Sequence, residues 1–157
     1  MGHFLRNRVD QRRVPEAVHF PEEIAPSAKN DDSLVFRVKL RERSFLLPGD
    51  AEKLSEHYML SESGPSSLQS DVLKIGHHGS KNSTIPDFLA AVRPRLAVIS
   101  SGEGNSYGHP SPQLVERLQT TGVPILRTDT NGAIHILTDG TNLEVSRFVA
   151  CRESLLR

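Results

Sequence analysis

The chain has 157 residues, the size of one domain, and its 19 basic and 19 acidic side chains give no formal net charge. A balanced charge argues against a protein that coats nucleic acid over its whole surface, although a local basic strip remains compatible with it. No apolar run approaches the roughly 18 residues of a membrane span, and the first 20 residues lack the apolar stretch of an export signal. We therefore expect a soluble chain, without a prediction of its localisation. The single cysteine, Cys151, excludes an intramolecular disulfide and a cysteine-based zinc cage, so a metal would need histidine and carboxylate ligands.

The first third of the chain contains a segment of little periodicity followed by a predicted hairpin. Residues 1–29 are rich in arginine and proline and are expected to be loosely ordered or partly extended. Apolar and charged residues then alternate over 33–40, which predicts a half-buried strand, and a charged turn leads to a second strand that ends at Asp50. A short helix is expected over 51–60, and the polar residues 61–70 are expected to form a linker.

The remainder alternates between strands and helices, which predicts a mixed α/β fold. The expected strands are 71–75, 96–100, 124–128, 133–137 and 143–149, and the last three are expected to form a meander. Two helices should lie between the earlier strands, one capped by Thr84 and ending before Pro94, the other capped by Ser111 and ending before Gly122.

Three loops that follow predicted strands carry residues suited to metal or phosphate chemistry. They read LLPGD, IGHHGS and YGHPSP, and in layered α/β folds sites assemble where strand ends meet. A carboxylate such as Asp50 can bridge two cations about 3.5 to 4 Å apart, and neutral imidazoles suit zinc or manganese. These residue types therefore fit half of a metallohydrolase site.

Each loop also has an ordinary structural interpretation. A Gly-Asp pair after a strand commonly forms a turn. His77 and His78 would point to opposite sides of an extended chain, so one would enter a site and the other would support it or contact substrate. His109 also fits a loop residue beside the helix that begins at Ser111. The other histidines, His3, His19, His57 and His135, are predicted to be structural or exposed.

Taken together, five phrases are far more specific than any one loop. NDDSLVFRV, FLLPGDAE, DVLKIGHHGSKNS, FLAAVRPRLAVISSGEGNSYGHPSP and RTDTNGAIHILTDG, in this order, resemble the C-terminal half of the metallo-β-lactamase-like domain of ComEC-type competence (DNA-uptake) proteins. The resemblance covers about residues 30–140. It implies an αββα sandwich with a two-metal centre of zinc or manganese. This chain would supply only the C-terminal half of that sandwich, so the fold would be incomplete. The implied activity is that of a phosphodiesterase or nuclease acting on DNA, and the parent family is a membrane protein.

The resemblance also assigns roles to individual residues. Asp50 would be the carboxylate that bridges the two metals, and His78 would be the late histidine ligand, with His77 beside it. The related phosphorylcholine esterases carry a similar His-His phrase, and the comparison with them favours the second histidine as the metal ligand. His109, Ser80 and Asn105 would line the side of the site that receives the substrate phosphate. Asp50, His78 and His109 would thus carry catalysis.

The chain departs from the family pattern in two ways. Pro48 stands where members often have threonine, and nothing in residues 1–49 matches the ligand motif His-x-His-x-Asp-His. We therefore expect residues 30–150 to form a partial domain, with 151–157 as a tail. This domain should be inactive until a missing N-terminal half is supplied. Without that half, we expect the chain to self-associate through an uncovered sheet face. Two alternatives remain: a non-catalytic module that binds nucleic acid or a partner, and a hydrolase of this fold that acts on a small phosphoester or a lactone.

Overall fold

The computed structural model describes residues 16–18 and 30–148. The predictions for residues 1–15, 19–29 and 149–157, including His3, His19 and Cys151, lie outside the described residues. Within these ranges no helix combines the length and the apolar character needed to cross a membrane.

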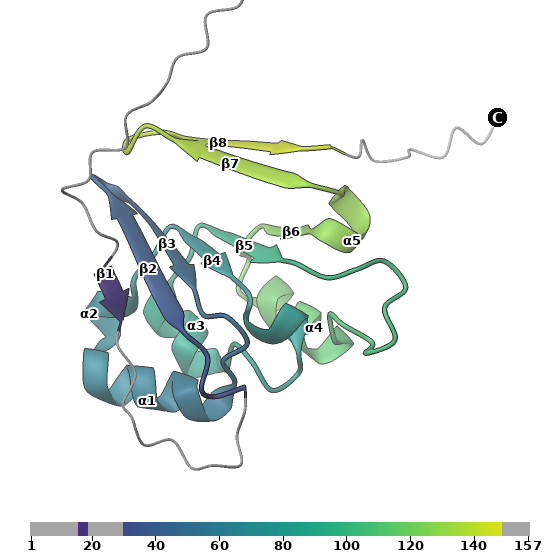
Figure 1. Ribbon diagram of the computed structural model, residues 1–157, viewed down its shortest axis with the longest axis horizontal. Helices are drawn as coiled ribbons and strands as arrows, with labels where there is room; N and C mark the ends of the chain where they lie inside the picture. Colours follow the sequence, from purple (N-terminus) through teal and green to yellow (C-terminus); the bar gives the residue numbers. More distant parts are fainter. Residues whose placement is uncertain (1–15, 19–29, 149–157) are drawn as a thin grey trace, which may run out of the picture.

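A six-stranded mixed sheet forms the centre of the molecule (Figure 1). Its strands are β1 (Glu16–Val18), β2 (Val35–Leu40), β3 (Arg43–Leu47), β4 (Val72–Lys74), β5 (Leu96–Ile99) and β6 (Ile125–Arg127), in that order across the sheet. The pairs β1·β2 and β2·β3 are antiparallel, whereas β3, β4, β5 and β6 run parallel. The parallel strands therefore bring their C-terminal ends to one edge of the sheet.

Helices cover one face of this sheet and bury the core against it (Figure 1). They are α1 (Lys53–Ser63), α2 (Pro65–Leu68), α3 (Pro86–Val92) and α4 (Pro112–Thr120). Leu46, Leu73 and Ala97 stand side by side on the sheet, and Phe88 and Leu118 are among the helix residues of the same core. Burying each large apolar side chain contributes about 1.5 to 3 kcal/mol relative to exposure.

The predicted linker over 61–70 is wrong, because α1 continues to Ser63 and α2 follows it. Leu68, the last residue of α2, is fully buried in the core. Leu68 is one apolar side chain among polar neighbours, so the sequence shows no helical periodicity in this segment. The packing of Leu68 nevertheless stabilises a helical turn that the local composition does not favour.

The C-terminal strands also differ from the predicted meander. β6 pairs with β5 in the main sheet, and a one-turn helix, α5 (Thr128–Asn131), follows where a turn was expected. β7 (Ile134–Thr138) and β8 (Leu143–Arg147) form a separate antiparallel hairpin. The tip of this hairpin rests on the β2–β3 turn, where the Glu42 amide donates to the Gly140 carbonyl at 2.9 Å and Arg43 Nε donates to the Thr141 carbonyl at 2.6 Å.

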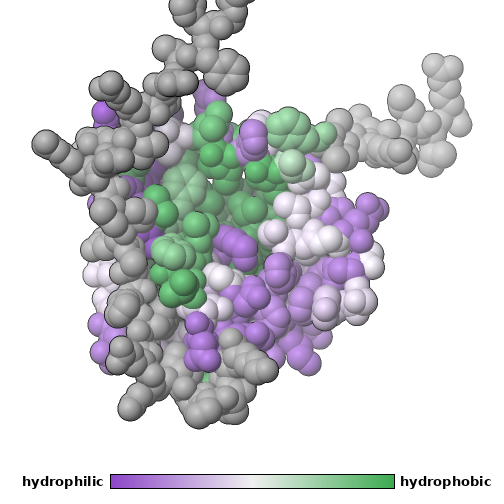
Figure 2. Space-filling view, in the orientation of Figure 1, coloured by the Kyte–Doolittle hydropathy of each residue, from purple (hydrophilic) through white to green (hydrophobic). Residues whose placement is uncertain are grey.

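The sheet face opposite the helices is apolar and partly open. Phe36 pairs with Leu47, and Val38 with Phe45, so these four side chains share the face that Leu46 does not occupy. Phe36 and Leu47 are 41% and 37% exposed. Figure 2 shows the resulting apolar surface over β2 to β5, beneath the hairpin. The expectation of an incompletely covered sheet face agrees with this arrangement.

The starts of α3 and α4 are stabilised in different ways. Ser111 caps α4 as predicted, since its Oγ accepts a hydrogen bond from the Leu114 amide at 3.2 Å. The predicted Thr84 cap is wrong, because the cap position of α3 is Ile85 and no side chain of the cap residue takes part. The amides of Thr84 and Ile85 instead donate to the Glu56 carboxylate of α1, at 2.5 and 2.8 Å.

Glu56 is consequently a buried acid that joins α1 to the start of α3. Its side chain is fully buried, and burial raises its pKa to about 7, although the Ile85 and Thr84 amides and the charge of Arg117 act in the opposite direction. Arg117 of α4 donates to the Ser83 and Thr84 carbonyls at 2.8 and 2.9 Å. Side chains of α1 and α4 thus fix the loop between the histidine pair and α3.

Candidate active site

The loops singled out in the sequence meet at the C-terminal edge of the parallel strands. Asp50 follows β3, and the histidine pair follows β4 within a short 3-10 turn, Gly76–Gly79. The His77 amide donates to the Gly49 carbonyl at 3.2 Å, which ties the two loops together. Parallel pairing of β3, β4 and β5 therefore places the candidate residues beside one another, as expected for strand ends in an α/β fold.

The histidine pair has a left-handed backbone, not the extended one expected. His77 has φ 44° and ψ 51°, and His78 has φ 52° and ψ 18°. This conformation costs a non-glycine residue roughly 1 to 2 kcal/mol. A Cβ on Gly76 would lie 2.7 Å from the Ala51 carbonyl oxygen, and one on Gly79 would lie 2.6 Å from Pro110 Cβ, so these glycines permit the close packing around the turn. The two rings still diverge, with centroids 6.4 Å apart at 65°.

His78 and Asp50 form the pair of groups best suited to hold a metal ion. His78 Nε2 lies 3.7 Å from Asp50 Oδ1, and both side chains are about half exposed. His78 Nδ1 lies 2.7 Å from the Ser100 carbonyl oxygen, so this nitrogen donates a hydrogen bond and Nε2 is the ring nitrogen directed at Asp50. A carbonyl that orients a histidine in this way is typical of metal sites, and the separation suits two ligands of one ion with bonds of about 2.0 to 2.2 Å.

These two donors fit part of a metal site but do not complete one. Among the described residues, no group of three or more histidine, cysteine, aspartate or glutamate side chains is placed to hold an ion. His77 does not join the pair, because its ring turns toward another partner.

That partner is Glu52, a residue that the sequence reasoning missed. Glu52 Oε1 lies 2.8 Å from His77 Nδ1 and accepts a hydrogen bond from Ser80 Oγ at 3.0 Å. The Glu52 amide donates to Asp31 Oδ1 at 3.1 Å, which fixes the backbone of Glu52. The only feature of the sequence that points to Glu52 is its position two residues after Asp50. That position does not reveal which histidine the Glu52 carboxylate contacts.

The third loop brings His109 next to His77. Their ring centroids lie 5.5 Å apart in an edge-to-face arrangement, and Tyr107 stacks on the other side of His109 at 6.3 Å. Nδ1 of His109 is buried without a hydrogen-bond partner among the described residues. Burial, followed by the charges of His77 and His78, lowers the pKa of His109 below 6.5, which favours its neutral form at pH 7.

Asn105 holds this third loop in shape. Its Oδ1 accepts hydrogen bonds from the His109 and Tyr107 amides at 3.1 and 3.2 Å, and its Nδ2 donates to the Gly102 and His109 carbonyls at 2.9 and 2.5 Å. The polar atoms of Asn105 are thus engaged within the loop, and its contribution to the site is to position His109.

A half-buried lysine adds positive charge beside Asp50. Lys74 Nζ donates to the Ile75 and Gly49 carbonyls at 3.2 and 3.4 Å. Burial lowers the pKa of Lys74, and the Asp50 carboxylate opposes this effect. Two carboxylates, Asp50 and Glu52, a cation, three imidazoles and the Ser80 hydroxyl therefore gather at this edge, a combination able to bind a metal ion and an anionic group.

Known proteins similar to this chain come from bacterial competence and recombination systems. The chain is 40% identical over 114 residues to ComE operon protein 3 of Bacillus subtilis (strain 168), a match that covers 73% of the chain and 14% of that protein. It is 37% identical over 134 residues to Competence protein ComA of Neisseria gonorrhoeae, covering 82% of the chain and 19% of that protein. A third match, at 34% identity over 136 residues, is Recombination protein 2 of Haemophilus influenzae, with coverage of 84% and 17%.

The chain therefore spans less than one fifth of the length of each of these relatives. No protein-family model matches it.

Proposed function

This chain belongs to the ComEC-type competence proteins, of which it corresponds to a segment, and we propose that it carries half of a metal-dependent phosphodiesterase site that acts on DNA during competence. The observation that carries the proposal is the geometry of His78, whose Nδ1 is bonded to the Ser100 carbonyl while its Nε2 faces Asp50 at 3.7 Å. An imidazole fixed in this tautomer beside a carboxylate is prepared to bind a divalent cation.

Asp50 and His78 are the residues of this chain that would hold the metal, zinc or manganese. A divalent ion bound there would supply a nucleophilic hydroxide and would offset the charge of the phosphodiester. The remaining ligands would come from a segment bearing the His-x-His-x-Asp-His motif, which the first half of such a domain provides.

The neighbouring residues would bind and orient the substrate phosphate. His77 would present its Nε2, because Glu52 holds the opposite ring nitrogen, and Ser80 shares the same carboxylate. His109, neutral at pH 7 because of its lowered pKa, can accept a proton. Lys74 would add a positive charge near Asp50.

The apolar sheet face supports the metallo-β-lactamase-like αββα architecture as part of this proposal. In such a sandwich a second sheet packs on the face that carries Phe36, Val38, Phe45 and Leu47. The second sheet would belong to the N-terminal half of the domain, or to another copy of this chain when that half is absent. We therefore propose that the chain is inactive by itself.

The test is reconstitution with the missing half. A separately produced segment that carries the His-x-His-x-Asp-His motif is added to the chain, and zinc or manganese stoichiometry and cleavage of labelled single-stranded DNA are measured. Both should increase on mixing, and Asp50→Asn or His78→Asn should abolish both gains. His57→Asn, which changes an exposed histidine of α1, is the matched control and should leave them intact. Failure of the mixture to gain either metal or cleavage would refute the proposal.

A further inference from the structure

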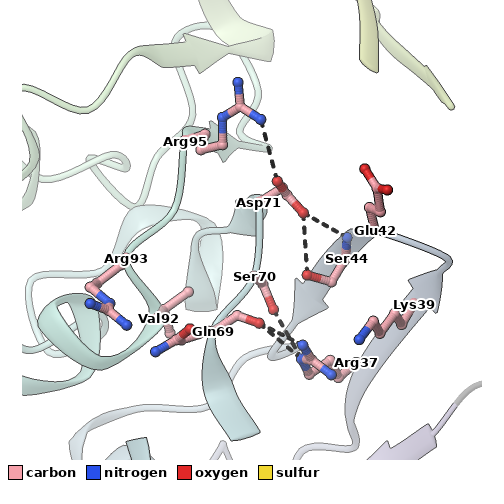
Figure 3. A pocket seen from close by; sticks show the side chains of 10 residues that line it. All are labelled: Arg37, Lys39, Glu42, Ser44, Gln69, Ser70, Asp71, Val92, Arg93 and Arg95. Atoms are coloured by element: carbon pink, nitrogen blue, oxygen red, sulfur yellow. Dashed lines mark hydrogen bonds and ion pairs between the residues drawn. The ribbon is translucent and has the colours of Figure 1, made fainter. Parts of the chain in front are cut away.

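A polar cavity lies at the opposite end of the sheet from Asp50 and His78, and Figure 3 shows the side chains that line it. Its volume is about 310 Å³. It is formed where β4 and β5 begin, between β2 on one side and the C-terminal end of α3 on the other. Four cationic side chains line it, Arg37, Lys39, Arg93 and Arg95, together with the carboxylates of Glu42 and Asp71.

The two carboxylates do not offset the charge of all four cations. Asp71 accepts hydrogen bonds from the Ser44 amide at 2.9 Å and from Arg43, which lies outside the lining, at 3.1 Å, and it forms an ion pair with Arg95 of the lining at 3.6 Å. Burial raises the pKa of Asp71, but the Ser44 amide and the charges of Arg43 and Arg95 outweigh burial and lower this pKa below its ordinary value. Figure 3 shows the Glu42 carboxylate turned away from Arg37 and Lys39. The lining therefore keeps an excess of positive charge.

Arg37 is held in place as a rigid donor. Its Nη2 and Nε donate to the Gln69 carbonyl at 2.7 and 3.1 Å, and Nε also lies 3.3 Å from Ser70 Oγ. A guanidinium fixed in this way loses little conformational entropy when it binds an anion, because its rotamer is already set.

The side chains of Lys39 and Arg93 line the same cavity, and no hydrogen bond or ion pair is found for either side chain among the described residues. Arg93 has a left-handed backbone, with φ 47°, at the end of α3. A cation at a helix C-terminus interacts favourably with the helix dipole, which accounts for Arg93 but not for Arg37 and Lys39 on β2. Three cations from two different elements thus converge on one polar space.

We propose that this cavity binds a phosphate group of a nucleic-acid strand, at a place separate from the Asp50 and His78 site. Arginine forks and a lysine match phosphate oxygens, and the neighbouring Gln69 and Ser70 add polar contacts. Val92 is the only aliphatic residue in the lining, and the exposed apolar side chains of β2 and β3 lie on the other face of the sheet. The cavity itself is therefore polar. An apolar groove that includes Leu89, Pro94 and Val123 begins on the other side of Arg93, so binding to lipid vesicles is measured beside binding to the oligonucleotide. The inference does not depend on the hydrolase proposal.

The test measures binding of a fluorescein-labelled thymidine oligonucleotide of about 12 residues to the whole chain by fluorescence anisotropy, in EDTA to exclude metal-dependent binding. Lys39→Ala combined with Arg93→Ala should weaken binding about tenfold or more. It should also flatten the dependence of log affinity on log salt by about one to two, as two phosphate contacts are lost. Lys53→Ala, which changes an exposed lysine of α1, is the control and should bind as the unaltered chain does.

A second measurement locates the contact. Titration with inorganic phosphate should move the amide NMR signals of residues 69–71, Arg93 and Arg95 in a saturable manner. Equal oligonucleotide affinity of the double variant and the unaltered chain would overturn the proposal. So would an equal loss in Lys53→Ala, or binding to phosphatidylglycerol vesicles without binding to the oligonucleotide.

Discussion

Replacing Glu56 by glutamine should remove a pH dependence from the unfolding free energy of the chain. The Glu56 carboxylate is fully buried, and its pKa in the folded chain is about 7 compared with an ordinary value of 4.5. Between these two pH values the folded chain binds more protons than the unfolded chain at this residue, so stability falls as pH rises. The contribution is complete below about pH 4.5 and is lost as pH passes through about 7. The difference in pKa corresponds to about 3 kcal/mol.

Glutamine cannot ionise, and its side-chain oxygen can still accept one of the two hydrogen bonds from the Thr84 and Ile85 amides. Loss of the second bond should cost about 1 to 2 kcal/mol at every pH. The variant should therefore be less stable than the unaltered chain at about pH 5. Between that pH and about pH 8, the unfolding free energy of the variant relative to that of the unaltered chain should rise by about 3 kcal/mol.

Urea denaturation at both pH values gives the two free energies, with sedimentation used to confirm that both chains have the same association state. Glu62→Gln, on the exposed side of α1, serves as the control and should show no such gain. A difference between the Glu56 variant and the unaltered chain that stays constant from low to high pH would show that the buried carboxyl does not titrate in this range.

Three further substitutions test the architecture around the candidate active site. Gly79→Ala should destabilise the chain by about 2 kcal/mol or more, because the new Cβ would lie 2.6 Å from Pro110 Cβ at a φ of +91°; an unchanged melting temperature would contradict this. Ser111→Ala should cost about 1 kcal/mol in a thermal melt through loss of the helix cap, and Ser111→Asp should restore most of it. Glu52→Gln should mix the two ring tautomers of His77, observed in the nitrogen-15 NMR of the imidazole, whereas a single tautomer identical to that of the unaltered chain would exclude the orienting role of Glu52.

Features that depend on neighbouring residues could be predicted from the sequence. Alternation over 33–40 gives β2, and Ser111 followed by proline gives the start of α4. The meeting of the Asp50 loop with the histidine loop was also predictable, because parallel strands deliver their ends to one edge of the sheet.

Features decided by distant residues could not be predicted in this way. Thr84 has the composition of a cap, but Glu56, 28 positions earlier, takes the amides that a cap would satisfy. Glu52 is unremarkable in sequence, and only the fold places it against His77. The left-handed turn of the histidine pair likewise depends on tertiary packing, which overrides the extended conformation that a strand end favours.

The β7–β8 hairpin has a consequence for how the apolar sheet face is protected. Its strands pair only with each other among the described strands, and its tip is held by bonds such as that of Arg43 to Thr141, 98 positions apart and exposed to solvent. No ladder hydrogen bond of the six-stranded sheet has to break for the hairpin to lift from the β2–β3 turn. In the proposed αββα sandwich, the hairpin would shield the bare sheet from other chains and would yield its place to the second sheet.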